Sequence, residues 1–522
     1  MPTPDQTRAT AFAALTTPQD VLILGGGATG LGLALDAATR NLRTTLVEAG
    51  DYAQATSSRA TKLVHGGVRY LASGQIHLVY EALHERAVML ANAPHLVHPL
   101  PTLLPASHLW ELPWFGAGLT LYDLLSGKST MGPTRILGKK ALATRIPGID
   151  LTKLKGGILY HDAQFNDARY ALSLALTAID HGATVLNYAR CKSFLYEIKK
   201  IAGAVVEDTE TQTEYTIRAK TVINATGIFT DQIRTLDQPS RPPLLSVSRG
   251  THIVVPANIL PGATAIMVPK TDDNRVIFAI PWQGAVLIGT TDIPDTTSAT
   301  EPTSTPAEID YLLATIRPYL ATHPTHADIL SIFSGQRPLV TGKEHTTSKL
   351  SREHHIDIAP STLITIAGGK WTTYRRMAQD TLDFAIKQNL IPPSPCITTT
   401  TPLHAAQTPP ANQDPHLAEY GTEAKTIEAL IHADPTLAAP MDPALPYTRA
   451  MLLHAIRHEQ ARTLEDLLSR RTRSLLLNAQ ASLRAAPAAA LLLAKELNRD
   501  ASWGQSQLNS FEAMAKEHYL PA

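Results

Sequence analysis

The chain has 522 residues, enough for about three or four domains of ordinary size. Hydrophobic residues make up 44% of it and charged residues 18%, and the 46 basic side chains balance the 46 acidic ones. This balance argues against a dedicated nucleic-acid-binding protein. The two cysteines, Cys191 and Cys396, are too few for a disulfide framework or a four-ligand zinc site, so a reducing cytosol suits the composition best.

The N-terminal part of the chain shows a βαβ pattern behind a short arm. Residues 1–19 hold one basic residue before a weak apolar run, so they do not look like a secretory signal and are expected to form a flexible arm. An apolar run at 20–24 then enters three glycines, a helical pattern follows over 29–40, and a second apolar run covers 44–47. Strand, helix and strand in this order indicate a βαβ unit.

The middle of the chain continues the α/β character and then changes. Residues 167–181 have a helical pattern, and short apolar runs at 221–224 and 363–367 each lead toward glycines. Between about 184 and 295, short β-rich runs alternate with turns that contain Gly, Pro or Asp-Asn. A mixed or antiparallel sheet is expected there.

The C-terminal part is predicted to be a helical domain behind a linker. Residues 391–416 contain seven prolines, a composition that resists regular structure. Residues 417–522 are rich in Ala, Leu, Glu and Arg at helical spacing. No apolar run approaches the roughly 18 to 20 residues that a membrane-spanning helix needs, so any membrane contact is expected to be peripheral.

The glycines after the first predicted strand have the spacing of a dinucleotide-binding loop. Gly25 permits a tight turn, Gly27 lets the backbone approach a pyrophosphate, and Gly30 packs the helix against the sheet. The helix N-terminus adds amide donors and a positive dipole. Glu48 ends the second strand 23 residues after Gly25, where its carboxylate can accept the ribose hydroxyls. These features predict bound FAD or NAD.

The sequence after Glu48 resembles the FAD-dependent glycerol-3-phosphate dehydrogenase family, and it is most similar to the form found in mitochondria and many bacteria. The resemblance begins with the segment from Thr56 to Leu71 and extends over about residues 18 to 518. Further motifs that carry it are Glu81–Arg86, Ala93–Leu96, Leu121–Asp123, Asn166–Arg169, Asn224–Gly227, His252–Pro256, Gly289–Asp292, Ser334–Leu339, Ser351–Arg352, Gly368–Arg375, Arg457–Glu459 and Arg470–Arg473.

Together with the predicted elements, the resemblance implies a mixed α/β fold. A Rossmann-like FAD-binding domain of the glutathione-reductase and D-amino-acid-oxidase type is expected to be interrupted by a β-rich substrate-binding domain and followed by an all-helical C-terminal domain. The expected boundaries are residues 20–105, 155–245 and 345–390 for the FAD-binding domain, 106–154 and 246–344 for the substrate-binding domain, 391–416 for the linker and 417–522 for the helical domain.

The resemblance also extends the set of residues expected to bind FAD. Thr56, Ser57 and Ser58 supply hydroxyls and amides, although a helix cap would use the same residues, and Gly66 with Gly67 lets the backbone approach a flat ring. The strand-to-helix junction at 368–370 can direct the positive end of a helix toward the flavin, where negative charge develops on reduction. The expected FAD-binding residues are Gly25, Gly27, Gly30, Glu48, Thr56, Ser57, Ser58, Lys62, His65, Gly66, Gly67, Gly227, Gly368, Gly369, Thr372 and Thr373. No His or Cys lies in a motif for covalent flavin linkage, so non-covalent binding is expected.

A phosphorylated alcohol needs several cations in one pocket and a group that takes the hydroxyl proton. Arg69, Tyr70 and Arg352 match positions in the family's motifs, and the resemblance implies that they bind the phosphate. The expected catalytic residues are His252, Arg337 and Lys370. Arg337 and Lys370 are assigned to the C2 oxygen, and His252 is the candidate general base because its ordinary pKa lies nearest neutrality. The alternative is that His252 only orients the substrate while an Arg or Lys assists deprotonation.

Metal chemistry finds little support in the sequence. His454 and His458 are four residues apart but lack the Glu of a zinc-protease motif, and no calcium-binding loop occurs in the tail, unlike in the animal mitochondrial enzymes of this family. No metal site is therefore expected. Ile228 stands where the family commonly has Pro, a difference that affects only the local loop shape.

Membrane contact is expected at residues 109–119, which hold two of the five tryptophans. An apolar lid or packing segment would have the same composition. Arginines between 457 and 473 could face anionic lipid or form salt bridges with neighbouring acids, and salt bridges are the favoured role.

The resemblance implies oxidation of sn-glycerol 3-phosphate to dihydroxyacetone phosphate, with hydride moving from C2 to the flavin and electrons passing to ubiquinone or menaquinone. The expected location is the cytoplasmic side of the inner membrane, peripherally attached to the lipid surface. No nucleic-acid partner is expected, and association into a homodimer is left open. The alternatives are an oxidase of the same family that releases hydrogen peroxide, although such oxidases carry an insertion not seen here, and a flavin-binding protein without catalysis.

Overall fold

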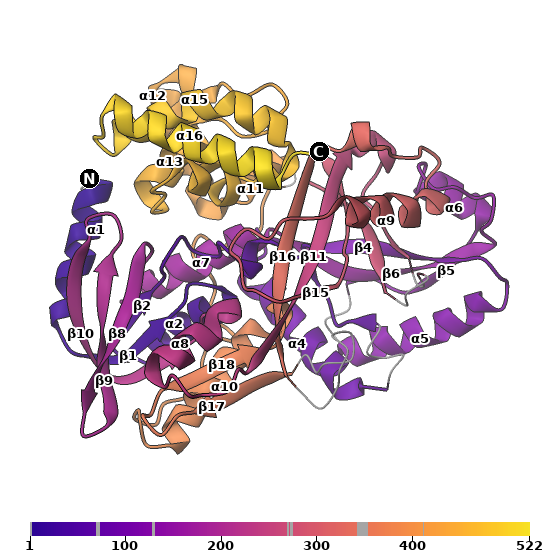
Figure 1. Ribbon diagram of the computed structural model, residues 1–522. Coiled ribbons are helices and arrows are strands. Elements are labelled where there is room, and N and C mark those ends of the chain that lie inside the picture. The colour runs from indigo at the N-terminus through magenta and orange to yellow at the C-terminus, as the bar shows by residue number, and fades with distance from the viewer. Residues whose placement is uncertain are drawn as a thin grey trace.

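The computed structural model describes residues 3–68, 74–127, 131–268, 271, 275–341, 353–410 and 412–521. Within these residues the chain forms two sheets that lie side by side, and helices of the C-terminal region lie above the first sheet (Figure 1). This is the mixed α/β architecture that the sequence predicts.

The first sheet is mostly parallel. Its strands, in spatial order, are β17 (His354–Ile358), β18 (Ile364–Gly368), β10 (Thr213–Asn224), β1 (Gln19–Leu24), β2 (Thr44–Val47) and β7 (Thr184–Leu186). Only β17 runs antiparallel to its neighbour. Beyond its parallel part, β10 pairs with β9 (Lys200–Asp208), which pairs with β8 (Ala189–Glu197).

Side chains of β1 alternate between two cores, as a strand buried on both faces requires. Val21 and Ile23 pack with the helices α2 (Ala28–Thr39), α7 (Asp167–Asp180) and α10 (Tyr374–Lys387). Leu22 and Leu24 point to the other face and pack with apolar residues of β8, β9 and β10. The parallel strands are therefore covered on both sides, and their carboxyl ends remain as the open edge.

Residues 4–16 form helical structure that packs on the first sheet, whereas the sequence led us to expect a flexible arm. Helix α1 (Pro4–Ala13) begins at a capping box in which Thr3 and Gln6 exchange hydrogen bonds. Phe12 is buried against the first sheet, and Arg8 forms a 2.7 Å ion pair with Asp208 of β9. The arm is therefore a docked helix.

The second sheet is built around the long strand β11. Its strands, in spatial order, are β15 (Ile293–Asp295), β11 (Leu245–Pro256), β14 (Ala285–Gly289), β13 (Ile277–Trp282), β12 (Ala265–Val268), β4 (Val97–Ala106), β6 (Gly156–Phe165) and β3 (Leu63–Val64), with β16 (Ser331–Val340) paired to β11 and β5 (Arg135–Gly138) paired to β6. The expected boundaries assigned β3, all of β4 but its last residue, and the whole of β6 to the FAD-binding domain, whereas their hydrogen bonds place them in this second sheet.

The remaining helices cover the sheets and build the C-terminal domain. Those outside the C-terminal region are α4 (Ile76–Asn92), α5 (Glu111–Ser126), α6 (Lys139–Arg145), α8 (Thr230–Asp237) and α9 (Pro306–Ile316). Those of the C-terminal domain are α11 (Pro415–Ala418), α12 (Ala424–Ala433), α13 (Arg449–His458), a π-helix (Asp466–Arg471), α14 (Ser474–Leu477), α15 (Ala479–Glu496) and α16 (Ala501–His518). Among the described residues, no helix combines the length and apolar character needed to cross a lipid bilayer.

The proline-rich linker has neither helix nor strand between Ile391 and Asp414 in its described part, yet it is attached to the first domain. The amide of Leu403 donates to the carbonyl of Asn92 over 2.8 Å, and a guanidinium nitrogen of Arg40 donates to the carbonyl of Ser394 over 2.9 Å. The linker therefore lies against the domain that it follows.

Candidate active site

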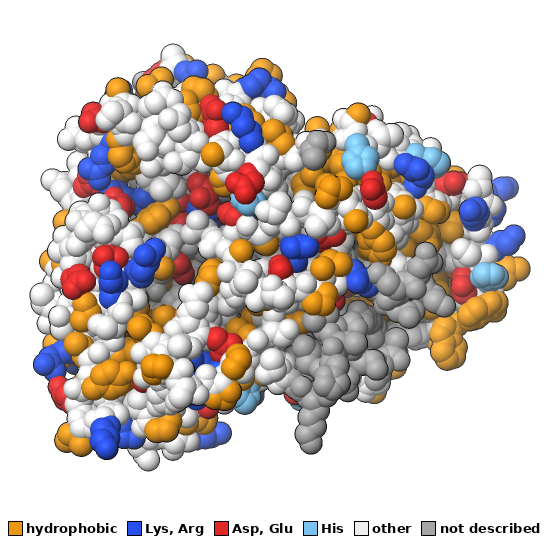
Figure 2. Space-filling model, in the orientation of Figure 1, with side chains coloured by type: hydrophobic (Ala, Val, Ile, Leu, Met, Phe, Trp, Pro, Cys, Tyr) orange, Lys and Arg blue, Asp and Glu red, His pale blue; other side chains and the backbone are white. Residues whose placement is uncertain are grey.

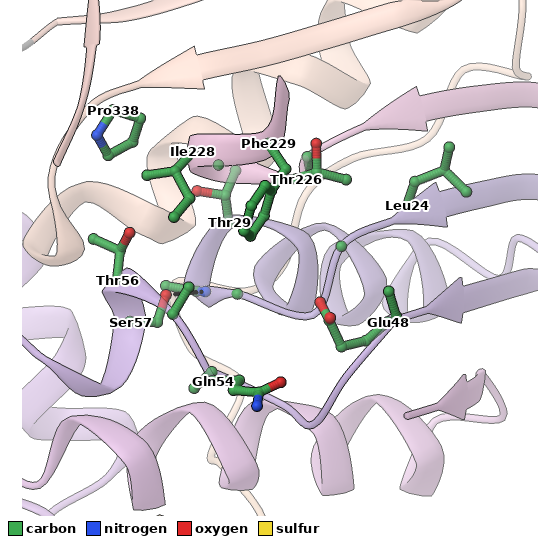
Figure 3. Close-up of a pocket in the computed structure, with 18 of the residues that line it drawn as sticks. Leu24, Thr29, Glu48, Gln54, Thr56, Ser57, Thr226, Ile228, Phe229 and Pro338 are labelled. Atoms are coloured by element: carbon green, nitrogen blue, oxygen red, sulfur yellow. Dashed lines mark hydrogen bonds between the residues drawn. The ribbon is translucent and has the colours of Figure 1, made fainter. Parts of the chain in front are cut away.

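A cavity of about 650 Å³ lies at the carboxyl ends of β1, β2, β10 and β18. This edge of a parallel sheet is where nucleotides bind in folds of this type. In Figure 3, Glu48, Gln54 and Ser57 lie on one side of the space, and Thr226, Ile228 and Phe229 lie on the other.

The glycine loop has the geometry that its sequence predicts. Gly25 has a φ of +109°, and a Cβ atom on it would lie 2.6 Å from the carbonyl oxygen of Ala225. A Cβ atom on Gly30 would lie 1.8 Å from the carbonyl oxygen of Gly25, so helix and loop can approach this closely only with glycine. Gly27 is the N-cap of α2 and has no side chain to cap the helix. The amide of Ala28 donates instead to the Ser57 hydroxyl over 2.9 Å, so Ser57 caps the helix from a distant segment. Gly27, Ala28 and Thr29 line the cavity, so the positive end of the helix lies at its wall, where an anion can bind.

Glu48 stands at the end of β2 beside this loop. Its two carboxylate oxygens accept hydrogen bonds from the amides of Gly26, over 2.6 Å, and Gly50, over 2.8 Å. Burial raises the pKa of the Glu48 carboxyl, and the two amide donors act in the opposite direction. The amides fix the orientation of the carboxylate, whose remaining lone pairs can accept ribose hydroxyls. Sequence reasoning assigned Glu48 this role from its distance to Gly25.

The junction between β18 and α10 forms another part of the cavity wall. Gly368 and Gly369 have φ values of +76° and +79°, and a Cβ atom on Gly369 would lie 2.4 Å from the sulfur of Met377. Lys370 lines the cavity, and Trp371 donates from Nε1 to the carbonyl of Ser57 over 2.8 Å. The two glycines let the backbone itself form this wall. The size of the cavity and its place at the sheet edge suit the adenine dinucleotide and ring system of FAD.

A second cavity, of about 930 Å³, is lined by residues of the second sheet and α5. Arg337 lines it, whereas the next residue, Pro338, lines the first cavity, so the two spaces are neighbours. The guanidinium of Arg337 donates to the Thr290 hydroxyl over 3.0 Å and to Asp292 over 3.4 Å. Asp292 also accepts a short hydrogen bond from Ser248. This arrangement fixes a cation at the wall of the larger cavity.

His252 lies behind the wall of the second cavity and lines neither space. Its ring is 2% exposed, stacks on Phe333 at 4.8 Å between ring centroids, and places Nε2 3.1 Å from the hydroxyl of Thr61. Burial lowers the pKa of His252 well below its ordinary value, and the cations Lys62 and Arg337 lower it further. The imidazole is therefore neutral at pH 7, and Thr61 lies on the cavity side of it.

Lys62 was expected to touch the cofactor, and the structure places its ammonium elsewhere. The side chain is fully buried, forms a 2.7 Å ion pair with Asp167 and donates to the carbonyl of Ser58 over 2.8 Å. Burial lowers the pKa of Lys62 to about 7. Lys62 lines neither cavity, and because its ammonium binds Ser58 and Asp167, it supports the wall of the first one.

The other expected residues divide between the two cavities and their supporting structure. Gly25, Gly27, Glu48, Thr56, Ser57, Gly227, Gly368, Gly369 and Lys370 line the first cavity, and His65, Gly67 and Arg337 line the second. Gly30, Ser58, Gly66, Thr372 and Thr373 line neither of these two cavities. The amide of Gly66 donates to the Tyr122 hydroxyl over 2.7 Å. Arg69, Tyr70 and Arg352, the expected phosphate ligands, lie outside the described residues.

Sequence reasoning gave no role to four polar residues that support this site. Thr61 contacts His252, Thr290 and Asp292 contact Arg337, and Asp167 pairs with Lys62. All four lie in segments already matched to the family, at 56–71, 166–169 and 289–292. The matched motifs could therefore have pointed to them, but their partners are distant in sequence.

Comparisons with known proteins agree with this geometry. Residues 20–375 match the model of the family described as FAD dependent oxidoreductase, and residues 361–503 match the C-terminal domain of alpha-glycerophosphate oxidase. The mitochondrial glycerol-3-phosphate dehydrogenase of Homo sapiens is 40% identical over 530 residues, which cover 95% of this chain and 73% of that protein. The mitochondrial glycerol-3-phosphate dehydrogenase of Schizosaccharomyces pombe is 37% identical and covers 92% of this chain and 84% of its own length.

Solved structures show the same likeness in three dimensions. The glycerol-3-phosphate dehydrogenase of Bacillus halodurans, solved in complex with FAD, superposes with a TM-score of 0.80 at 29% identity and covers 99% of this chain and 98% of that one. The L-alpha-glycerophosphate oxidase of Mycoplasma pneumoniae, with a TM-score of 0.56 at 18% identity over 70% of this chain and 94% of that one, shares the fold. The chain belongs to the FAD-dependent oxidoreductase family and, within it, to the glycerol-3-phosphate dehydrogenases.

Proposed function

We propose that the protein oxidises sn-glycerol 3-phosphate to dihydroxyacetone phosphate and passes the electrons to a membrane quinone. The observation that carries the proposal is the adjacency of a dinucleotide cavity and a second cavity whose wall holds a fixed arginine, Arg337. Bound FAD supplies a two-electron hydride acceptor for the C2 hydrogen of the substrate. The residues around it bind the phosphate, orient the alcohol and take its proton.

The phosphate is assigned to Arg69, Tyr70 and Arg352 on the strength of the family's motifs. A dianion needs several charge-assisted hydrogen bonds, and two guanidinium groups with a phenol supply them. Arg337 and Lys370 hold the C2 oxygen. Lys370 lines the first cavity and Arg337 the second, so a substrate between the two cavities can be reached by both.

His252 takes the hydroxyl proton in this proposal, with Thr61 as the group between it and the substrate. The 3.1 Å contact between Nε2 of His252 and the Thr61 hydroxyl supports this assignment. The lowered pKa of His252 keeps the ring neutral and able to accept a proton, but it also disfavours the protonated product. The alternative is that His252 only orients the alcohol, and the variant His252→Gln distinguishes the two roles.

The electron acceptor is assigned from the apolar side chains that line one end of the second cavity. Trp114, Phe115 and Leu121 of α5 line this cavity, and Trp114 is 70% exposed to solvent. Leu109 and Trp110, just before α5, are also exposed. Figure 2 shows hydrophobic side chains on the side of the molecule where α5 lies in Figure 1. Aromatic and leucine side chains of this kind bind at a lipid interface. We therefore assign α5 to the cytoplasmic surface of the inner membrane and quinone to the apolar end of the cavity.

Acceptor assays test the quinone assignment. Purified enzyme is supplied with sn-glycerol 3-phosphate and either a water-soluble ubiquinone or dissolved oxygen, and quinone reduction is compared with peroxide release. The proposal predicts fast quinone reduction and little peroxide. Fast peroxide release with slow quinone reduction would assign the chain to the oxidases instead.

A further inference from the structure

One wall of the dinucleotide cavity consists of residues 48–58, here called the wall segment. Glu48, Gly50, Gln54, Thr56 and Ser57 of this segment line the cavity, and all of these but Gly50 are labelled in Figure 3. Apart from a short 3₁₀ turn at 56–58, the segment has neither helix nor strand. Its conformation therefore depends on tertiary contacts. The carbonyls of Glu48 and Gly50 accept from the amides of Ala189 and Tyr188 over 2.7 Å each, and a further set of contacts comes from the C-terminal domain.

The first of these contacts comes from the π-helix of the C-terminal domain. Arg471 binds Asp51 with two nitrogens, Nη1 over 2.6 Å and Nη2 over 2.8 Å, and Nε of Arg470 donates to the same carboxylate over 2.6 Å. Asn187 adds a donor at 3.0 Å. Burial alone would raise the pKa of Asp51, but the guanidinium groups of Arg471 and Arg470 hold it well below its usual range. Asp51 is therefore a buried, ionised anchor three residues after Glu48.

The second contact lies at the other end of the wall segment. Arg473 donates from Nη2 to the carbonyl of Ser58 over 2.6 Å and to Asp167 over 3.3 Å. The same Ser58 carbonyl accepts from Lys62 over 2.8 Å. Arg473 is fully buried, and its other terminal nitrogen donates to the carbonyl of Ser469 within its own domain.

A third contact lies near the middle of the wall segment. Glu465, at the start of the π-helix, accepts from the Gln54 side chain over 3.3 Å and from Arg470. Gln54 lines the cavity, and the amide of the preceding Ala53 donates to the carbonyl of Gly26 in the glycine loop over 2.9 Å. The contacts behind the wall segment are thus connected to the loop that faces the pyrophosphate position.

Stability alone does not explain this arrangement. Removing several charges from water is costly, and well-packed apolar residues give comparable stability without that cost. Buried charge pairs instead fix one geometry, because each donor and acceptor has a defined direction. Here the fixed geometry is that of a cavity wall, and π-helical turns are frequent where function constrains a helix.

We propose that Arg470, Arg471 and Arg473 form a bracket through which the C-terminal domain holds the wall segment in its FAD-binding conformation. The helical domain is then part of the cofactor site, and its arginines are positioning residues for FAD. Pre-organising the wall lowers the ordering cost of binding, so loss of the bracket weakens FAD binding more than it weakens the fold.

The test measures FAD binding in full-length Arg471→Met and Arg471→Lys. FAD release from each purified holoenzyme and its rebinding after removal of free flavin are followed by flavin fluorescence. A lost charge-assisted hydrogen bond predicts an FAD dissociation constant raised about tenfold to 100-fold in Arg471→Met and a smaller rise in Arg471→Lys. With saturating FAD, KM for sn-glycerol 3-phosphate stays at the wild-type value.

Arg484→Met is the matched control, because Arg484 pairs with Asp442 in the same domain and its side chain is 57% exposed. Its FAD dissociation constant is expected to equal that of the wild type. Should Arg471→Met fail to fold, Glu465→Ala replaces it, since Glu465 is partly exposed and contacts both Arg470 and Gln54. Wild-type FAD affinity in a folded bracket variant with a lowered Tm would overturn the proposal, because the bracket would then serve the fold alone.

Discussion

Nε2 of His252 and the hydroxyl of Thr61 lie 3.1 Å apart, and Thr61 is the member of the pair that lines the larger cavity. The imidazole itself is 2% exposed and stacked on Phe333. A proton that leaves an alcohol in the cavity therefore reaches His252 most directly through the threonine hydroxyl.

Thr61→Val keeps the shape of the side chain and removes this hydroxyl. We expect the rate of anaerobic flavin reduction to fall about fivefold or more, since a positioned polar contact of this kind contributes about 1 kcal/mol or more. Thr61→Ser keeps the hydroxyl and should retain most of the rate. Stopped-flow absorbance measures both, and an unchanged rate in Thr61→Val would exclude the relay.

His252→Gln separates the two roles left open for this residue. Loss of a general base lowers the rate of flavin reduction by about 100-fold to 10,000-fold. Loss of an orienting role, which His252 would exert through the Thr61 hydroxyl, costs about tenfold and raises KM. The comparison of kcat with KM in this variant decides between them.

Arg337→Met is expected to lower kcat/KM for sn-glycerol 3-phosphate about tenfold to 150-fold, the cost of one charged hydrogen bond. The neighbours Thr290 and Asp292, which receive hydrogen bonds from the guanidinium, hold it at the cavity wall. Arg317→Met removes an exposed arginine elsewhere and serves as the control. Equal kcat/KM in the two variants would place Arg337 outside the substrate site.

Gly30→Ala is expected to abolish FAD binding, because the added Cβ atom would lie 1.8 Å from the carbonyl oxygen of Gly25. Gly138→Ala adds the same atom in open space and should purify with wild-type flavin content. The ratio of flavin to protein absorbance measures the effect, with circular dichroism to show that both variants fold. A flavin-replete Gly30→Ala would contradict the assignment of the loop.

The membrane assignment is tested with Leu109→Ser combined with Trp110→Ser. Both side chains are more than half exposed, and neither lines the described cavities. The double variant should co-sediment less with anionic phospholipid vesicles and reduce membrane quinone more slowly, while its activity with a soluble dye is unchanged. Tyr196→Ser, an exposed aromatic on β8, is the control. Undiminished vesicle binding would place the lipid contact elsewhere.

His95 is one of the buried histidines that should make the fold less stable at acidic pH, because burial lowers its pKa to about 3. The ordinary histidine pKa is about 6.5, so between pH 6.5 and 3 the unfolded chain binds a proton there that the folded protein does not. Acidification through this window therefore favours unfolding. Between pH 7 and pH 5, the Tm of His95→Gln should fall less than the Tm of the wild type. Differential scanning fluorimetry measures both.

The sequence predicted the parts of the site that depend on local geometry. The Gly25, Gly27 and Gly30 spacing could be interpreted because only glycine permits those backbone approaches, and Glu48 followed from its distance along the chain. The FAD assignment and the glycerol-3-phosphate dehydrogenase family came from matched motifs, and the comparisons confirm both.

The parts that sequence reasoning missed depend on contacts between distant segments. The pairing of Lys62 with Asp167 joins residues 105 positions apart and removes Lys62 from the cavity. The pairing of Asp51 with Arg471 spans 420 positions. Helix α1 was missed for a local reason, because its capping box lies in a polar segment whose apolar residues are few. The two ion pairs, in contrast, join residues far apart in the chain, and no periodicity within one segment reveals such partners.

The most direct test of the account is the flavin spectrum of the purified protein under anaerobic conditions, before and after addition of sn-glycerol 3-phosphate. The account predicts an oxidised flavin spectrum that bleaches rapidly on addition of this substrate and returns when quinone is added. Bound flavin that stays oxidised in the presence of sn-glycerol 3-phosphate would contradict the assigned reaction.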